Sequence, residues 1–524
     1  MKKSWRPSGA ILLVFAFGLL IGSSAGAQAP KAKASAGKAG SAEQRGEMQL
    51  AAARTNLLQL RHFLREMPKG ADLHYHLSGG VYAESFIRAA VEDGLCVDVK
   101  KLAFVKCSPA GDDDKNIVPA VSAYKNQNLY DALVNSFSMR SFVPHAGVSG
   151  HDHFFDTFAK FGGTSPLHKA EWVDEAAKRA AAQNEQYLEL METPDFSLSA
   201  KIAGEVGWKE DLKQLREELL AHNLKENVKS AVEHLNEVER KRREIERCAE
   251  VDAAEACKVD TRFIYQILRG LPKEIVFAQT LLGFEVATAD PERIVGINFV
   301  MPEDGYVSMN DYALHMRMVK YLHEIYPSVH ITLHAGELAY GLVPPDGLCC
   351  HVRLAVEAGA ERIGHGVDVM LEDRPHELLK EMAAKHVMAE INLTSNDVIL
   401  GVSGKNHPLP MYRQFGVPVA LSTDDEGVSR IDLTNEYVRA VETHGLKYAD
   451  LKKMARTGLE HAFLPGASLW EKRDEFTQSV GLCVKDALGA EKPSSKCVEF
   501  LKTSEKAQQQ WELERRFRVF EAGF

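Results

Sequence analysis

The sequence predicts an α/β fold, a (β/α)8 barrel with helical insertions and extra C-terminal helices. Eight apolar, strand-like runs alternate with helical stretches. Polar motifs end several of these runs, and the active site of such a barrel lies at the carboxyl ends of its strands. The expected strands are residues 72–77, 187–193, 262–268, 294–301, 330–334, 362–366, 387–393 and 418–425.

The first 27 residues have the pattern of an export signal. Three basic residues precede an apolar run over residues 10–21, and Ala25-Gly26-Ala27 is an A-x-A cleavage pattern. The apolar run is shorter than the ~20 residues that a membrane-spanning helix needs. We expect cleavage after Ala27, a periplasmic or secreted protein, and no stable membrane anchor after cleavage.

Residues 28–46 contain no bulky apolar side chain, so we expect a disordered tether there. The rest of the chain, residues 47–524, is expected to form one barrel domain. The whole chain is 45% hydrophobic and 26% charged, as in ordinary globular proteins with a large core. Its net charge of −10 argues against a nucleic-acid-binding surface.

Eight cysteines follow the export signal, and six of them form pairs that are close in sequence. In an oxidising compartment these pairs are disulfide candidates. They are Cys96 with Cys107, Cys248 with Cys257, and Cys483 with Cys497. Cys349 and Cys350 are adjacent and would bridge only with strain, so free buried thiols stay open as the alternative.

Helical patterns flank and interrupt the alternation. Residues 54–66 form an expected helical lead-in to the first strand. The charged stretch of about residues 219–250 is interpreted as a helical insertion, possibly a hairpin arm, without chemistry of its own. Helices near residues 447–459 and 506–520 are expected after the barrel, with a C-terminal helical extension over about residues 465–524.

His74 and His76 lie two residues apart on the first expected strand. Alternate residues of a strand face the same side, so both imidazoles can share one metal ion. Surface histidines are the alternative, because an H-x-H motif alone is common.

A second such pair, His151 and His153, lies among phenylalanines at helical spacing. Residues two apart on a helix do not face each other, so we do not expect a metal site there. The phenylalanines are expected in the core, although one ring could line a substrate wall.

The run Leu333-His-Ala-Gly-Glu337 carries a further histidine and a carboxylate. A strand that ends at His334 can direct its imidazole at an ion, and Gly336 lets the backbone turn so that Glu337 faces the same cavity.

Together these motifs predict one zinc ion with an open position for water. Three imidazoles and one carboxylate suit that ion, which lowers the pKa of water toward ~7. The expected ligands are His74, His76, His334 and Asp424.

Three further residues are candidates for the reaction itself. His365, between two glycines, could orient the water or accept its proton; a packed strand histidine is the alternative. Glu337 is placed to protonate a ring nitrogen of the substrate. Asp425 could bond a second ring nitrogen if the strand ends there, and a helix cap or turn is the alternative role.

At these motifs the sequence resembles the adenosine deaminase family of metal-dependent hydrolases. The resemblance covers about residues 60–460. The matching stretches are Met67-Pro-Lys-Gly-Ala-Asp-Leu-His-Tyr-His-Leu, Tyr187-Leu-Glu-Leu-Met-Glu-Thr-Pro194, Leu333-His-Ala-Gly-Glu337, Arg362-Ile-Gly-His-Gly366 and Ser422-Thr-Asp-Asp425.

The resemblance implies zinc-dependent conversion of adenosine, and possibly 2'-deoxyadenosine, to inosine and ammonia. Hydroxide would attack C6 of the purine while Glu337 protonates N1. His365 would assist the water, and Asp425 would contact N7. The implied partner is therefore a small purine nucleoside.

Two departures from the family concern sugar and purine recognition. The family's aspartate after H-x-H-L, which helps to bind ribose, is Ser78 here, and Gly296-Ile-Asn-Phe-Val-Met301 replaces its usual Gly-Ile-Asp-Leu-Ala-Gly. The alternatives are a deaminase of another aminopurine, a nucleotide or an N6-modified adenosine, and a non-catalytic nucleoside-binding or signalling protein on the same barrel.

Overall fold

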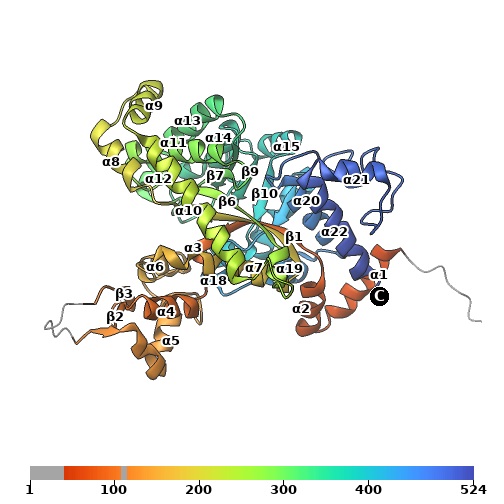
Figure 1. The fold of residues 1–524 in the computed structure, drawn as a ribbon, viewed down its shortest axis with the longest axis horizontal. Coiled ribbons are helices and arrows are strands. Elements are labelled where there is room, and N and C mark those ends of the chain that lie inside the picture. The colour runs from red at the N-terminus through yellow and green to blue at the C-terminus, as the bar shows by residue number, and fades with distance from the viewer. Residues whose placement is uncertain (1–40, 108–114) are drawn as a thin grey trace, which may run out of the picture. The chain divides into compact units, whose positions relative to one another are not determined.

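Eight parallel strands form the centre of the computed structural model, which describes residues 41–107 and 115–524 (Figure 1). All eight expected strands are present, paired in the order β1-β5-β6-β7-β8-β9-β10-β11. The strands are β1 Gly70–His76, β5 Glu185–Glu192, β6 Asp260–Leu268, β7 Ile294–Val300, β8 His330–Ala335, β9 Arg362–His365, β10 Met388–Ile391 and β11 Val419–Leu421.

Contacts between the first strand and the segment after the last one bring the two edges of the sheet together. The amide of His76 donates to the carbonyl of Asp424 at 3.0 Å, and the amide of Asp424 donates to the carbonyl of His74 at 2.9 Å. Nearby, the buried carboxylate of Asp72 accepts from the amide and hydroxyl of Thr423 at 3.1 and 2.6 Å. These bonds confirm the predicted (β/α)8 barrel.

Helices in the crossover connections pack around the barrel, because their apolar faces must be buried against the strands and against one another. The principal ones are α7 Lys169–Ala182, α10 Leu224–Ile245, α11 Lys273–Ala289, α13 Tyr312–Ile325, α14 His351–Glu357, α15 Pro375–Lys385, α17 Leu409–Phe415 and α20 Tyr448–His461. Shorter or peripheral helices are α3 Leu77–Gly80, α8 Ser197–Val206, α9 Leu212–Ala221, α12 Tyr306–Asn310, α16 Leu393–Leu400, α18 Glu426–Ser429 and α19 Leu433–His444.

The structure corrects the interpretation of the charged stretch at residues 219–250. It is helical, as predicted, but α10 packs between α7 and α11 as a crossover helix of the barrel and is not a projecting arm. Leu224, Leu235 and Val238 are buried on its inner face, while the charged side chains cover its outer face.

The N-terminal helices precede the barrel. Helix α1 is Ala42–Ala53 and α2 is Leu57–Glu66, capped by the Asn56 side chain, which accepts from the Leu58 and Gln59 amides. The predicted lead-in is therefore confirmed, but residues 42–46 belong to α1 and not to the tether. Residues 42–524 form one compact unit. The expected export signal and residues 28–40 of the tether lie outside the described residues.

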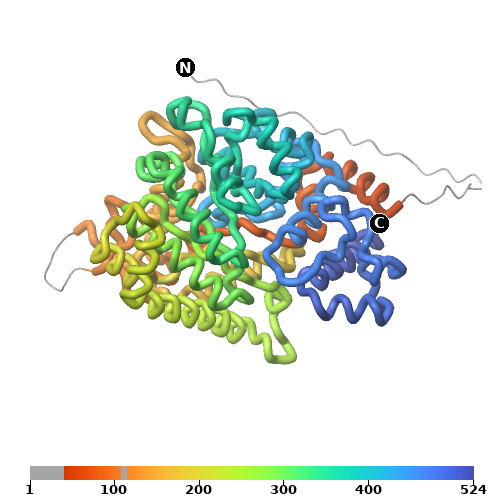
Figure 2. Tube along the Cα trace, turned by 90° about the horizontal axis from the view of Figure 1, so that it is seen from above, coloured from red at the N-terminus to blue at the C-terminus, as the bar shows by residue number. Residues whose placement is uncertain are grey.

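The C-terminal helices α21 Ser495–Lys502 and α22 Glu505–Glu521 follow the barrel, and the second corresponds to the helix expected near residues 506–520. Helix α22 packs against α20 and α1, so the two ends of this unit lie side by side (Figure 2).

Besides α3 and α7, the connection between β1 and β5 holds a small three-stranded antiparallel sheet in the order β3-β2-β4, together with α4, α5 and α6 (Figure 1). These elements are α4 Ala83–Glu92, β2 Cys96–Asp98, β3 Ala103–Val105, β4 Ile117–Pro119, α5 Gln127–Ser136 and α6 Gly150–Lys160. Helix α6 packs against α16, which follows β10, and this contact brings its phenylalanines to the barrel.

All eight cysteines are paired. The bonds Cys96–Cys107, Cys248–Cys257 and Cys483–Cys497 have the predicted connectivity. Cys349 and Cys350 are also joined, where free thiols were the alternative. No helix within residues 41–107 and 115–524 is long and apolar enough to cross a membrane.

Candidate active site

The four predicted metal ligands converge at the carboxyl ends of the strands. His74 and His76 lie on β1, His334 lies on β8, and Asp424 follows β11. The Nε2 atom of His334 is 3.1 Å from Nε2 of His74 and 3.1 Å from Nε2 of His76. Oδ1 of Asp424 is 3.3 Å from Nε2 of His74 and 3.2 Å from Nε2 of His76. Four donor atoms therefore surround one small space.

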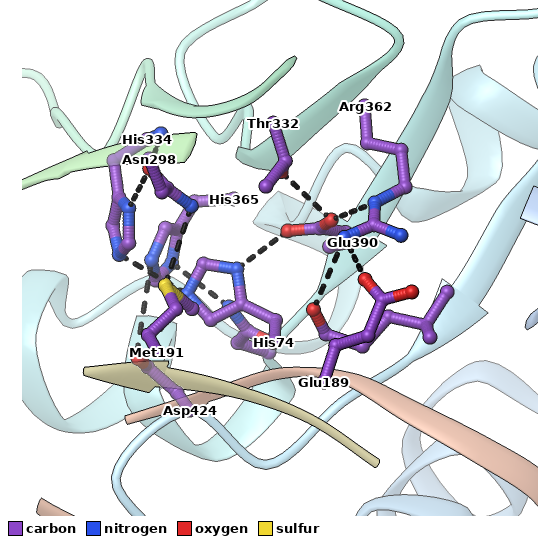
Figure 3. A network of polar contacts seen from close by, with 12 residues as sticks. His74, Glu189, Met191, Asn298, Thr332, His334, Arg362, His365, Glu390 and Asp424 are labelled. Carbon is purple, nitrogen blue, oxygen red and sulfur yellow. Dashed lines mark hydrogen bonds and ion pairs between the residues drawn. The ribbon is translucent and has the colours of Figure 1, made fainter. Parts of the chain in front are cut away.

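Each of the three imidazoles is held at Nδ1 by a side-chain oxygen from another strand, and Figure 3 shows this for His74 and His334. His74 is 2.6 Å from Oε2 of Glu390, His76 is 2.7 Å from Oε1 of Gln266, and His334 is 2.9 Å from Oδ1 of Asn298. An Nδ1–H group that donates to such an acceptor leaves the Nε2 lone pair free for a metal.

The orienting roles of Glu390, Gln266 and Asn298 were not predicted from the sequence. A signal for them exists: Glu390 and Asn298 are the only polar residues of their strands, and Gln266 interrupts the apolar half of β6, so each needs a partner in the interior. Asn298 also donates from Nδ2 to the sulfur of Met191 at 3.3 Å, which is consistent with the assigned orientation of its amide.

Glu390 is itself held within the barrel (Figure 3). Its Oε1 accepts from Nε of Arg362 at 2.7 Å and from the hydroxyl of Thr332 at 2.9 Å. Burial alone would raise the pKa of Glu390, but Arg362 and His74 outweigh it and lower that pKa. The Glu390 carboxylate therefore stays charged and continues to accept the hydrogen bond from Nδ1 of His74.

This donor set fits a single divalent ion of the zinc type. Three imidazole nitrogens and one carboxylate oxygen lie within 4.8 Å of one another, and all four residues are buried.

Glu337 lies beside this group. Its Oε1 is 3.7 Å from Nε2 of His365. Burial, and then the charges of Asp424 and Glu303, raise the pKa of Glu337 well above its usual value. A raised pKa favours the protonated form of the carboxyl group, which can donate its proton.

His365 faces the same space from the end of β9. It has a positive φ of 68°, and its Nε2 is 3.7 Å from Oδ2 of Asp424. Asn396 donates from Nδ2 to Nδ1 of His365 at 2.9 Å, and its Oδ1 accepts from Nε2 of His407 at 3.0 Å. With this amide orientation, neutral His365 carries its proton on Nε2, toward the cavity. Burial lowers the pKa of His365 to about 3, which keeps the ring neutral.

Asp425 also reaches the cavity, because β11 ends at Leu421 and Asp424 has a positive φ of 65°. Oδ1 of Asp425 is buried and has no hydrogen-bond partner among the described residues. Burial raises the pKa of Asp425 to about 8. Gly79 makes room for this side chain, because a Cβ there would lie 1.5 Å from Oδ1 of Asp425.

A cavity of about 400 Å³ opens beside these groups. Its lining residues are His76, Ser78, Phe154, Phe155, Phe158, Ala159, Gln266, Leu268, Val300, Met301, Pro302, His334, Glu337, Asp424 and Asp425. The phenylalanines of residues 154–161 were expected in the core, with one ring able to line a substrate wall. The structure corrects this expectation, because three phenylalanines of α6 line the cavity. Helical spacing could not predict this wall of the cavity, because spacing identifies an apolar helix face but not the surface that the face contacts.

The second histidine pair lies on α6, as predicted. His151 bonds Oδ1 of Asp304 through Nε2 at 2.9 Å, and His153 bonds the carbonyl of Ser138 at 3.1 Å. The two rings therefore have separate partners.

Comparisons with known proteins place this site in a family. The model of the adenosine deaminase family matches residues 169–477. Adenosine deaminases of Escherichia coli strains SMS-3-5 / SECEC and SE11 are each 39% identical over 145 residues, which is 28% of this chain and 40% of each relative. The chain thus matches less than half the length of these curated relatives.

Solved structures also match this chain, at lower identity. Arabidopsis ADAL complexed with IMP is 20% identical, with a TM-score of 0.48, over 77% of this chain and 94% of that one. Adenine deaminase from Arthrobacter aurescens is 17% identical, with a TM-score of 0.47, over 76% and 94%. The family model matches more than half of the residues of this chain, and the chain therefore belongs to the adenosine deaminase family.

Proposed function

We propose that the protein is a zinc-dependent aminohydrolase that converts adenosine and water to inosine and ammonia. The observation that carries this proposal is the convergence of three imidazoles and the Asp424 carboxylate next to the buried Glu337 side chain, whose pKa is raised by burial. A zinc ion held by these four ligands would lower the pKa of water toward ~7 and so supply hydroxide at neutral pH.

The surrounding side chains can then do the remaining chemistry. Glu337 donates its proton to N1 of the purine, which makes C6 more electrophilic. The Nε2–H group of His365 donates a hydrogen bond to the attacking oxygen. Asp425, with its pKa raised to about 8, carries a proton at neutral pH and can donate to N7, an atom that only accepts. These roles agree with the positions of the three groups, because Glu337 and Asp425 line the cavity and His365 lies next to Glu337 and Asp424.

The cavity favours a nucleoside over a nucleotide. Among its lining residues none is a lysine or arginine, and eight are apolar residues that would leave a phosphate without partners. Ser78 is the neutral polar side chain that can meet a sugar hydroxyl, since Gln266 already bonds His76 and Thr193.

A substrate panel tests the proposal. Adenosine, adenine, AMP, guanosine and an N6-methyl adenosine are each incubated with the zinc-loaded protein, and the change in ultraviolet absorbance is followed. We expect turnover of adenosine and none of AMP, and we expect Glu337→Gln to bind zinc but to lose turnover. Zinc and nucleoside binding without turnover of any purine would favour a binding protein instead.

We also propose that the chain is exported after cleavage at Ala27 and that the unit of residues 42–524, which begins with α1 and not at residue 47, acts as one domain. Four disulfides support export, because such bonds persist in oxidising compartments. Amino-terminal sequencing of the exported protein tests it, and a first residue other than Gln28 would contradict the cleavage site.

A further inference from the structure

Glu303, three residues after the end of β7, holds the backbone that carries Glu337. The amide of Gly336 donates to Oε1 of Glu303 at 3.0 Å, and the amide of Glu337 donates to Oε2 at 2.7 Å. Each carboxylate oxygen thus binds one of two consecutive amides. The Glu303 side chain is fully buried, so these bonds do not compete with solvent.

Glu303 is fixed from its other side by His351. Nδ1 of His351 donates to Oε1 of Glu303 at 2.5 Å, and the His351 ring stacks on Tyr312 with 3.6 Å between ring centroids. The hydroxyl of Tyr312 donates to the carbonyl of His351 at 3.0 Å, which ties α13 to the start of α14. The carboxylate of Glu303 is therefore held by a rigid pair of helices.

Arg269 connects the same carboxylate to the metal site. Its Nη2 is 3.9 Å from Oε2 of Glu303, and its Nη1 donates to the carbonyl of His334 at 3.1 Å. Its Nε donates to the carbonyl of Met301, a pocket-lining residue with a positive φ of 85°. One buried guanidinium thus links the carboxyl ends of β7 and β8 at the site.

The turn between His334 and Glu337 needs an acceptor from outside it for the amides of Gly336 and Glu337. Gly336 has a positive φ of 73°, which only glycine adopts readily. Both amides of this turn need an acceptor in the interior, and Glu303 supplies it. The direction of the Glu337 side chain therefore depends on a residue that does not touch the substrate cavity.

We propose that Glu303 is a positioning residue that sets the Glu337 carboxyl group against N1 of the substrate. This rests on the proposed function, in which Glu337 is the proton donor. Glutamine cannot replace Glu303. A side-chain amide has only one acceptor oxygen, and its NH2 group would face one of the two backbone N–H donors.

The test compares Glu303→Gln with Glu303→Asp and with a matched control, Glu372→Gln. Glu372 also binds two consecutive amides with its two oxygens, those of Val352 and Arg353, but not the turn that carries Glu337. We expect Glu303→Gln to lower kcat roughly 10- to 100-fold, with KM changed less than about 3-fold and zinc content unchanged. Glu303→Asp, which keeps both oxygens, should recover part of kcat, and Glu372→Gln should stay near wild type.

A second readout does not depend on activity. Hydrogen–deuterium exchange of the peptide covering residues 333–341 should be faster in Glu303→Gln than in wild type and in Glu372→Gln, because the amides of this turn lose an acceptor. Normal exchange there, an unchanged kcat, or an equal loss of kcat in Glu372→Gln would each overturn the proposal.

The two proposals fail in different ways. If wild type turns over no purine, the proposed function is wrong, while the exchange experiment still tests the bonds from Glu303. If wild type is active and Glu337→Gln is not, but Glu303→Gln equals wild type, only the positioning role is wrong.

Discussion

Glu390 accepts a hydrogen bond of 2.6 Å from Nδ1 of His74, and neither side chain is exposed to solvent. The carboxylate fixes the imidazole in the tautomer and direction that a metal ligand needs. We expect Glu390→Gln to weaken zinc binding roughly 10- to 100-fold. Competition with a chromogenic chelator measures the zinc affinity.

A matched control for this variant is Glu361→Gln. Glu361 also accepts from a histidine Nδ1, that of His330, at 2.7 Å, but both side chains are partly exposed and lie outside the metal site. Equal zinc affinities in the two variants would contradict the role assigned to Glu390.

Removal of the metal should destabilise the protein as well as stop turnover. A ligand that binds only the folded state stabilises it by about 2.7 kcal/mol at a concentration 100 times its Kd. We expect chelation to lower Tm and added zinc to restore it. His334→Ala, which removes one donor atom, should have a Tm that responds little to zinc; a full response would exclude His334 as a ligand.

Gly336→Ala should disrupt the turn before Glu337. A Cβ at this position would lie 2.4 Å from Oδ1 of Asp368 and 2.8 Å from Cγ2 of Val352, and the residue has a positive φ of 73°. We expect a loss of roughly 2–4 kcal/mol in the free energy of unfolding, together with loss of activity. Urea denaturation and a turnover assay measure the two effects.

Gly341→Ala separates backbone strain from lack of space. Gly341 also has a positive φ, 95°, but a Cβ there would meet nothing within 4 Å. It should lose only about 1–2 kcal/mol and keep its activity. If both variants lost the same stability, steric crowding at Gly336 would not be the cause.

His315 on α13 should make the protein less stable in acid. Neither ring nitrogen has a hydrogen-bond partner among the described residues, and burial, followed by the charge of Arg269, lowers its pKa from 6.5 to about 4. The unfolded chain therefore takes up a proton below about pH 6.5 that the folded chain does not, so stability falls as the pH falls toward 4.

Between pH 7 and pH 5 this group should cost about 2 kcal/mol of unfolding free energy. His315→Leu should remove that part of the pH dependence, which denaturant unfolding of both proteins at the two pH values measures. An identical loss of stability in both proteins would assign the acid sensitivity to other groups.

The sequence by itself determined the eight strands, the order of the motifs and the residues that meet at the metal site. Strand alternation and apolar runs specify which residues face inward, and the carboxyl ends of parallel strands must meet at one edge. His74, His76, His334 and Asp424 could be found this way because each stands at a strand end. Three cysteine pairs could be found because their partners are close along the chain.

Only the tertiary structure decided which side chains hold these residues in place and what forms the walls of the cavity. Glu390, Gln266, Asn298 and Glu303 act through partners that are between 33 and 316 residues away in sequence, so no local pattern tells which residues they contact. The phenylalanines of α6 show the same limit. Helical periodicity says that one face is apolar, but packing in space decides whether that face meets the core or a substrate cavity.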